Sequence, residues 1–331
     1  MRRSPLTHVL AVLIALVASV CSLVLFGTGG TGVWQAFVRF DFGGMGLPIA
    51  LQVGGCLLLL VVILTGIRSS AGLLAVGFFS ILGLLLTSIP HLLGILVGDF
   101  RLPMQTYEIA LSGLLSIGFG ILGASGIAAA IARRTRSASQ LGARVAVHVA
   151  TPLLLLGGIT AIIWGLNVFT LYFQNSFGGG TPVTAGLAQL VGLLMVAAGT
   201  VLAARAPMSL LLPAATIAVV TILLFIPGRM PWFLSRTPAS ISFLVLAGGA
   251  TAFVLVCTAV MLAIIRRRAL QGPQERSDVG AVPNPYAQHT QFASSSQTPN
   301  PHPGTQQGWQ SDPSSHHAQP DEHLPPTHHS R

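Results

Sequence analysis

The sequence has no lysine and little charge of either sign. All 17 basic residues are arginine, only eight residues are acidic, and charged residues make up 8% of the 331-residue chain. A soluble domain has about 25% charged residues, so this chain has too few to cover a water-facing surface. Because 52% of its residues are hydrophobic, we expect much of that apolar surface to face lipid. This composition excludes an ordinary soluble globular protein.

Cysteine is scarce as well, and motifs with a known chemistry are absent. Cys21, Cys56 and Cys257 fall within apolar segments, without the spacing of a metal site or a disulfide framework. We interpret them as small buried hydrophobic residues. The sequence contains no Walker A, HExxH or GxSxG motif, and no pair of carboxylates in or near an apolar segment. We therefore expect a protein that is not an enzyme and has no cofactor and no metal site.

Eight apolar segments of about 20 residues or more lie between residues 8 and 265. A helix of roughly 20 apolar residues is long enough to cross a bilayer. Turn-forming residues separate the segments, as at 27–30, 68–70, 178–180 and 205–207. The pattern predicts an all-α polytopic membrane protein with about eight transmembrane helices, at residues 8–27, 48–67, 71–90, 107–132, 145–171, 184–204, 208–227 and 240–265.

The first segment resembles a signal peptide, because Arg2 and Arg3 precede an apolar run. No Ala-x-Ala cleavage site follows it, and Val20 before Cys21 makes a poor lipobox. We therefore interpret the segment as an uncleaved first transmembrane helix.

The arginines cluster at helix ends and predict the orientation of the chain. With the N-terminus inside, eleven arginines lie at inner helix ends and four at outer ends: Arg39, Arg101, Arg229 and Arg236. Basic residues favour the cytoplasmic side, and an even number of helices places both termini there. An arginine-only composition fits a high-GC genome. The location that we expect is the plasma membrane of a bacterium. Because the positive charge reports orientation, nucleic-acid binding is not expected.

The two halves of the apolar region resemble each other. Four residues recur 137 positions later without a gap: Gln52, Gly55, Arg68 and Pro90 match Gln189, Gly192, Arg205 and Pro227. We predict two parallel four-helix repeats, residues 1–135 and 136–268, with the same orientation in the membrane. The matched prolines predict that the third helix ends near Pro90 and that residues 91–99 form a short apolar segment at the outer interface.

Residues 269–331 have a different composition. Ten of these 63 residues are proline, and most of the others are Gln, Ser, His, Asn and Thr. Such a segment buries too little apolar surface to offset the entropy of ordering it. We predict a disordered cytoplasmic tail. Its seven histidines could bind Zn²⁺ or Ni²⁺ weakly, and a solvated tail without a metal is the favoured interpretation.

Gln52 and Gln189 are the leading candidate site residues, because each is an uncharged polar residue near the outer end of the second helix of its half. The functional hypothesis is an intramembrane polar pair that lines a path or a ligand site. The simpler hypothesis, which we favour, is that each forms a hydrogen bond to a neighbouring helix.

Two further groups of residues are weaker candidates. His91, Asp99 and Glu108 form a possible outer-face cluster, although solvated loop residues are the interpretation that we favour. Small residues crowd the fourth helix and predict close helix packing, either within the chain or between copies in a homo-oligomer: Gly113, Ser116, Gly118, Gly120, Gly123, Ala124, Gly126 and Ala128.

The features together favour a non-enzymatic scaffold or accessory subunit in a bacterial envelope, embedded in the lipid bilayer, with residues 269–331 available to bind a protein partner. The alternative is a transporter or channel. No charged residue falls at the centre of a predicted helix, and ion coupling usually needs an ionisable group there. A transported substrate would therefore be neutral or lipid-like and would pass between the two repeats.

Overall fold

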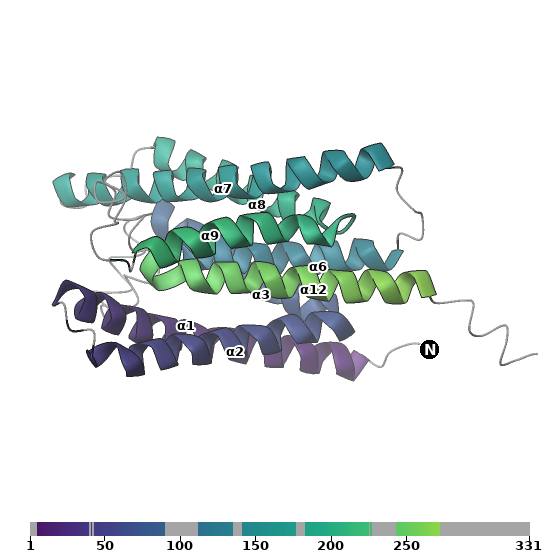
Figure 1. Ribbon diagram of the computed structural model, residues 1–331, viewed down its shortest axis with the longest axis horizontal. Coiled ribbons are helices and arrows are strands. Elements are labelled where there is room, and N and C mark those ends of the chain that lie inside the picture. Colours follow the sequence, from purple (N-terminus) through teal and green to yellow (C-terminus); the bar gives the residue numbers. More distant parts are fainter. Residues whose placement is uncertain are drawn as a thin grey trace, which may run out of the picture. The chain divides into compact units, whose positions relative to one another are not determined.

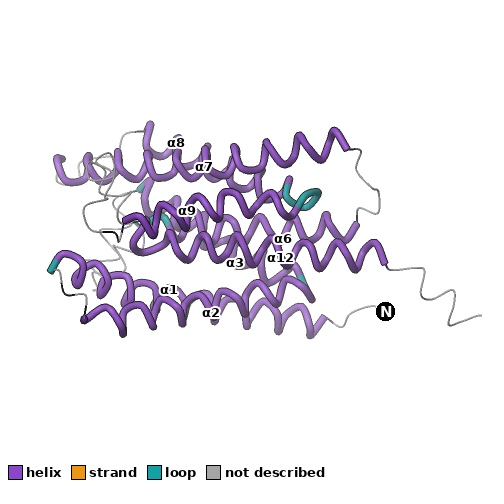
Figure 2. The backbone as a smooth tube through the Cα atoms, viewed as in Figure 1, coloured by secondary structure: helices purple, strands orange, loops and turns teal. Residues whose placement is uncertain are grey.

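The computed structural model describes residues 5–39, 41, 43–89, 112–134, 141–176, 183–224, 226 and 243–271. The chain divides into two units, Met1–Glu275 and Arg276–Arg331, and all described residues belong to the first. That unit is built from helices (Figures 1 and 2). The expected tail is outside the described residues except for its first three residues, 269–271.

Among the described residues, seven helices are long and apolar enough to cross a membrane. Their candidate spans have mean hydropathies between 2.0 and 3.0. This protein is therefore a helical membrane protein, as predicted. The spans lie on α1 (Pro5–Val38), α2 (Gly46–Arg68), α3 (Ser70–Ser88), α6 (Phe119–Arg134), α7 (Leu141–Ser176), α8 (Val183–Leu202) and α12 (Gly249–Gln271). Those of α2 and α6 begin in the short turns that precede these helices, at Gly43 and Leu114.

Shorter elements accompany these helices. A π-helical turn, η2 (Leu114–Gly118), leads into α6, and a second one, η4 (Phe243–Gly248), leads into α12. A 3-10 turn, η1 (Gly43–Met45), precedes α2, and another, η3 (Pro207–Leu210), precedes α9 (Leu211–Leu224). The 14 residues of α9 span about 21 Å at 1.5 Å per residue. With η3, the apolar helix covers Pro207–Leu223, which is shorter than any of the seven candidate spans.

One expected break is wrong, because α1 continues through Gly27, Thr28, Gly29 and Gly30. Tertiary packing explains the difference. A Cβ on Gly29 would lie 2.7 Å from the backbone oxygen of Pro48 in α2, so the glycines allow α2 to approach closely. Thr28 also donates its hydroxyl to the Val24 carbonyl at 2.8 Å, which satisfies it within the helix. The glycine-rich stretch is a contact surface of α1.

Other expected boundaries are confirmed. Helix α2 ends at Arg68, and α3 begins after Ser69, whose Oγ accepts a hydrogen bond from the backbone N–H of Ala71 at 3.3 Å. Such a hydroxyl satisfies one of the free N–H groups at a helix start. Helix α3 ends at Ser88, close to the predicted end at Pro90. The start of the expected tail differs slightly from the prediction. Helix α12 continues to Gln271, so the first three residues of that tail are helical.

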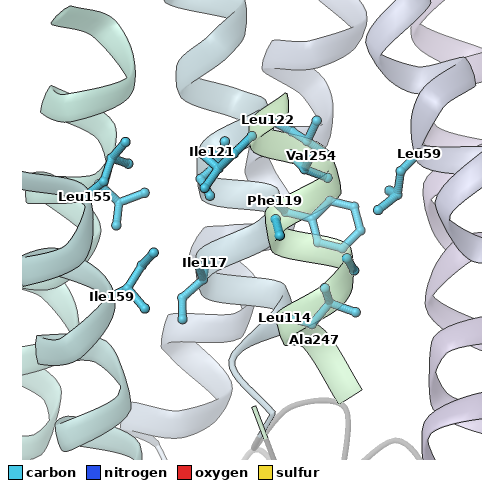
Figure 3. Close-up of a cluster of buried hydrophobic side chains, with 14 of the residues drawn as sticks. Leu59, Leu114, Ile117, Phe119, Ile121, Leu122, Leu155, Ile159, Ala247 and Val254 are labelled. Carbon is cyan, nitrogen blue, oxygen red and sulfur yellow. The ribbon is translucent and has the colours of Figure 1, made fainter. Parts of the chain in front are cut away.

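Helices α6 and α12 are the inner helices of the unit. In their apolar windows 78% and 56% of the residues are buried, against at most 39% in the other five. Helices α1 and α2 pack as one pair and α7 and α8 as another (Figure 1). In the view of Figure 3, Phe119 of α6 and Val254 of α12 lie between Leu155 of α7 and Leu59 of α2. The centre of the unit is therefore a packed apolar core.

The small residues of α6 contact other helices of the same chain. A Cβ on Gly123 would lie 2.6 Å from the Gly77 Cα, so the backbones of α6 and α3 touch at this point. A Cβ on Gly120 would meet the Leu193 side chain of α8 at 2.7 Å. These contacts support packing within the chain. They also leave little of this face for the alternative, contact between copies in a homo-oligomer, which stays a prediction.

Arginine side chains bind the carboxyl ends of neighbouring helices. Arg133, near the end of α6, donates from its Nη2 to the backbone carbonyls of Gly66 and Ile67 in α2. Arg266, in the last turns of α12, donates from its Nη1 to the carbonyl of Arg205, just after α8. Positive charge at a helix C-terminus complements the helix dipole and the free carbonyls there. In the prediction, Arg133, Arg205 and Arg266 lie at inner helix ends. The contacts show that the helix ends carrying these residues lie next to other helix ends assigned to the same side.

Candidate functional site

Gln52 lies in the second turn of α2 and is half-buried. Its Nε2 donates a hydrogen bond to the backbone carbonyl of Val245 at 3.1 Å. Val245 belongs to η4, so the bond joins the two halves of the chain. No hydrogen bond reaches Gln52 Oε1 from the described residues. The amide nitrogen therefore binds η4, and the amide oxygen can accept a hydrogen bond from another group.

Gln189 lies in α8 and is completely buried. Its Oε1 accepts a hydrogen bond from the Thr87 hydroxyl of α3 at 2.5 Å. Its Nε2 is buried, and no hydrogen-bond partner for it is found among the described residues. The amide thus links α8 to α3 through its oxygen, while no described residue binds its nitrogen.

The two glutamines share one feature of their surroundings. A Cβ on Gly29 of α1 would lie 3.1 Å from the backbone nitrogen of Gln52. A Cβ on Gly165 of α7 would lie 3.3 Å from the backbone nitrogen of Gln189. In each half, a glycine of the first helix lets the second helix approach at its glutamine. Each glutamine also binds an element of the other half, as the hydrogen-bonding hypothesis expects.

The hydrogen bonds do not join the glutamines to each other. Gln52 binds η4 and Gln189 binds α3, and the two residues have no hydrogen-bond partner in common in the part of the chain that the structure describes. The amides occupy two separate places.

A pocket of about 430 Å³ lies beside Gln52. Residues of α1, α2, α9, η4 and α12 line it, so it is formed by both halves of the chain. Phe26, Leu57 and Phe253 supply apolar surface, and Gln52 and Thr221 supply polar groups. The lining contains no charged residue. An apolar pocket with a few converging polar groups is the usual form of a small-molecule site.

Thr221 is the polar group that sequence reasoning missed. Its Oγ1 is buried and has no hydrogen-bond partner in the described residues. A Cβ on Gly248 would lie 2.4 Å from this oxygen, so the hydroxyl packs directly against η4. Its only signal in the sequence is that of a single threonine in an apolar segment. Such a threonine usually donates its hydroxyl to the backbone carbonyl one turn earlier in the same helix, so it does not stand out.

The other predicted candidates have different outcomes. His91, Asp99 and Glu108 lie outside the described residues, so the outer-face cluster stays a prediction. Within the residues that the structure does describe, no group of three or more His, Cys, Asp or Glu side chains could hold a metal ion. Cys56 lines the pocket, and Cys21 is exposed, so neither is the fully buried residue that the sequence predicts.

The π-helical turns were also missed. Gly113 has a φ of 73° and begins η2, and Ser112 Oγ accepts a hydrogen bond from the Leu114 N–H at 3.3 Å. A left-handed glycine interrupts the regular helix expected over 107–132. In the second half, η4 supplies the carbonyl that Gln52 binds. Single π turns inside helices often occur at functional sites.

Comparisons with protein-family models, with curated proteins and with solved structures find no match.

Proposed function

We propose that this chain is a membrane-embedded scaffold or accessory subunit without enzymatic activity, whose C-terminal tail binds a protein partner. The observation that carries this proposal is the closed centre of the unit. Every fully buried side chain among the described residues is apolar or carries a hydroxyl or amide group. Close packing of α6 and α12 favours a static platform over a conducting path.

The proposed architecture is a tandem repeat of four helices, with eight crossings in total. The equivalent contacts of Gly29 with Gln52 and of Gly165 with Gln189 support it. The arginines Arg133 and Arg266 support it further. They stand 133 positions apart: Arg133 binds carbonyls in the last turn of α2, and Arg266 binds the Arg205 carbonyl three positions after the end of α8. The crossing beyond the seven candidate spans would be the shorter apolar helix Pro207–Leu223.

The proposed location is the plasma membrane of a bacterium, with both termini in the cytoplasm. This orientation depends on which helix ends are assigned to the inner side of the membrane. The contacts of Arg133 and Arg266 support that assignment, because each joins two helix ends assigned to the inner side. His8 Nδ1 and Ser69 Oγ share a hydrogen bond of 2.8 Å, which brings the start of α1 to the end of α2. The tail from residue 272 onward is proposed to be disordered because of its composition and to act as the interaction arm.

The alternative function is a carrier for a neutral or lipid-like substrate. The pocket beside Gln52 favours it, because both halves of the chain line this pocket and no charge faces it. In a carrier, relative movement of the halves would expose such a site alternately to the two sides. The buried Gln189 would mark the corresponding place in the second half.

Two variants separate these functions in a strain that depends on the protein. The first ends after Gln271, so α12 stays complete and only residues 272–331 are removed. The second combines Gln52→Leu with Gln189→Leu and retains the tail. The scaffold proposal expects loss of the growth phenotype with the truncated chain and near-normal growth with the double variant.

Membrane content of both variants is measured by immunoblot as the control, so that loss of protein is not mistaken for loss of function. A normal phenotype of the truncated chain would contradict the proposed role of the tail. Loss of growth with a folded, membrane-inserted double-glutamine variant would instead indicate the carrier.

A further inference from the structure

We infer that the pocket between α2, α9 and α12 binds a neutral lipid with one hydroxyl group next to its chains, of the diacylglycerol type. This inference does not depend on whether the protein is a scaffold or a carrier. The pocket lies between helices of a membrane protein, so the molecules that reach it from the bilayer are lipids.

The lining determines the charge of the ligand. The lining residues with polar side chains are Gln52, Thr221 and Cys56. None of them carries a charge that would offset the burial of a phosphate or an ammonium group, and an unpaired buried ion is costly. A neutral headgroup avoids this cost.

The polar atoms determine the chemistry of the headgroup. Gln52 Oε1 can accept a hydrogen bond, because the Nε2 of the same amide is already bound to the Val245 carbonyl. The Thr221 hydroxyl is buried, has no hydrogen-bond partner in the part of the chain that the structure describes, and can donate or accept. A ligand hydroxyl that donates to Gln52 and accepts from Thr221 would satisfy both groups. A hydrocarbon alone would supply no partner for the Thr221 hydroxyl.

The apolar lining accommodates a lipid chain. Phe26 of α1 and Phe253 of α12 contribute aromatic surface, and Val53 and Leu57 of α2 contribute aliphatic surface. A volume of about 430 Å³ is within the range of about 300–1,000 Å³ that is usual for small-molecule sites. The pocket therefore holds the headgroup and part of a chain, and the rest of the chain extends into the bilayer.

Gly249 is a position in the pocket lining at which a larger side chain can be added without a clash of its Cβ. It lines the pocket at the start of α12, and a Cβ built on it meets no atom within 4 Å. A leucine at this position therefore enters open space. Gly46 at the start of α2 also has no atom within 4 Å of a built Cβ and does not line the pocket, which makes Gly46→Leu the matched control.

The test uses the purified full chain in phosphatidylcholine nanodiscs with a diacylglycerol probe that carries a photoactivatable diazirine in one acyl chain. Adducts are mapped by mass spectrometry after irradiation. We expect them to concentrate on pocket residues such as Cys56 and Phe253 and to be displaced by unlabelled diacylglycerol. Gly249→Leu should lower this labelling at least fivefold, and Gly46→Leu should leave it unchanged.

A second variant separates a ligand role from a structural one. Thr221→Val removes a hydroxyl that has no hydrogen-bond partner among the described residues, so the melting temperature should stay the same or rise. The affinity for the probe should fall about fivefold, because the loss of one hydrogen bond of about 1 kcal/mol changes a dissociation constant by that factor. The inference is overturned if Gly249→Leu leaves pocket labelling unchanged. It is also overturned if Cys56 and Phe253 are labelled no more than a lipid-facing residue such as Phe78.

Discussion

Thr87 on α3 donates a hydrogen bond of 2.5 Å to Oε1 of Gln189 on α8, joining residues 102 positions apart in the chain. The bond connects the third helix of the first half to the second helix of the other. It is the only hydrogen bond to the Gln189 side chain among the described residues, because Nε2 has none.

Thr87→Val should destabilise the protein more than Gln189→Leu. The valine leaves a buried amide with no hydrogen bond, at a cost of about 1–3 kcal/mol. The leucine removes both amide atoms, and Thr87 still has the Gly83 carbonyl at 3.0 Å, so its cost should stay below about 1.5 kcal/mol, as for a volume-conserving change. Unfolding in mixed micelles with increasing SDS measures both. A larger effect of Gln189→Leu would mean that the amide has partners other than Thr87.

Gly123→Ala should destabilise the contact between α6 and α3. The added Cβ would lie 2.6 Å from the Gly77 Cα, so the helices must separate, at a cost of about 1–3 kcal/mol. Gly54→Ala is the matched control, because its Cβ would lie 3.4 Å from Leu25, an ordinary contact. It should be neutral or stabilising by up to about 1 kcal/mol, since alanine favours a helix over glycine. Equal effects of the two alanines in the same unfolding assay would contradict the close crossing.

Arg133→Gln should lower stability more than Arg266→Gln. The Arg133 guanidinium is partly buried and binds two carbonyls of α2, whereas Arg266 forms an exposed bond to one carbonyl. A hydrogen bond from a charged donor contributes about 1.5–3 kcal/mol when it is buried, and exposure reduces this value. The melting temperatures of the two variants are compared by thermal unfolding in detergent with a thiol-reactive dye. Both variants carry Cys21→Ala, because Cys21 is exposed and would react with the dye before unfolding. A lower melting temperature for Arg266→Gln than for Arg133→Gln would mean that the Arg266 contact contributes more to stability, which contradicts this prediction.

The orientation is tested by reporter fusions at two positions. Alkaline phosphatase fused after Phe42 should be active, because this position is expected outside the cell. The same enzyme fused after Arg136 should be inactive, because that position is expected in the cytoplasm. The expectation follows from eleven arginines at inner helix ends against four at outer ends. The opposite pair of results would invert the topology and place both termini outside.

The apolar segments were predictable because their length and their punctuation are local properties. The break at Ser69 follows from a serine that caps the next helix, and the end of α3 at Ser88 follows from the proline two positions later. The continuous helix through Gly27–Gly30 could not be predicted in this way. Its stability depends on contact with Pro48 in another helix, and a glycine run by itself indicates a break.

The candidate site was predictable in part. Gln52 and Gln189 stood out because amides are rare in apolar helices and because they recur at one offset. Their partners could not be found from the sequence. Thr87 and the carbonyl of Val245 are separated from them by 102 and 193 positions, and hydropathy does not specify which helices are neighbours. Thr221 carries no pattern of its own, and its importance comes from the pocket that surrounds it.

The central claim is that the helices form a platform and that the tail binds a partner. The most direct measurement is chemical cross-linking in native membranes, followed by purification of the full chain and of the chain that ends after Gln271, with quantitative mass spectrometry of the captured proteins. The account predicts a specific partner that the full chain and the Gln52→Leu, Gln189→Leu variant capture equally and that the truncated chain loses. Capture of the same proteins in the same amounts by the truncated chain would contradict it.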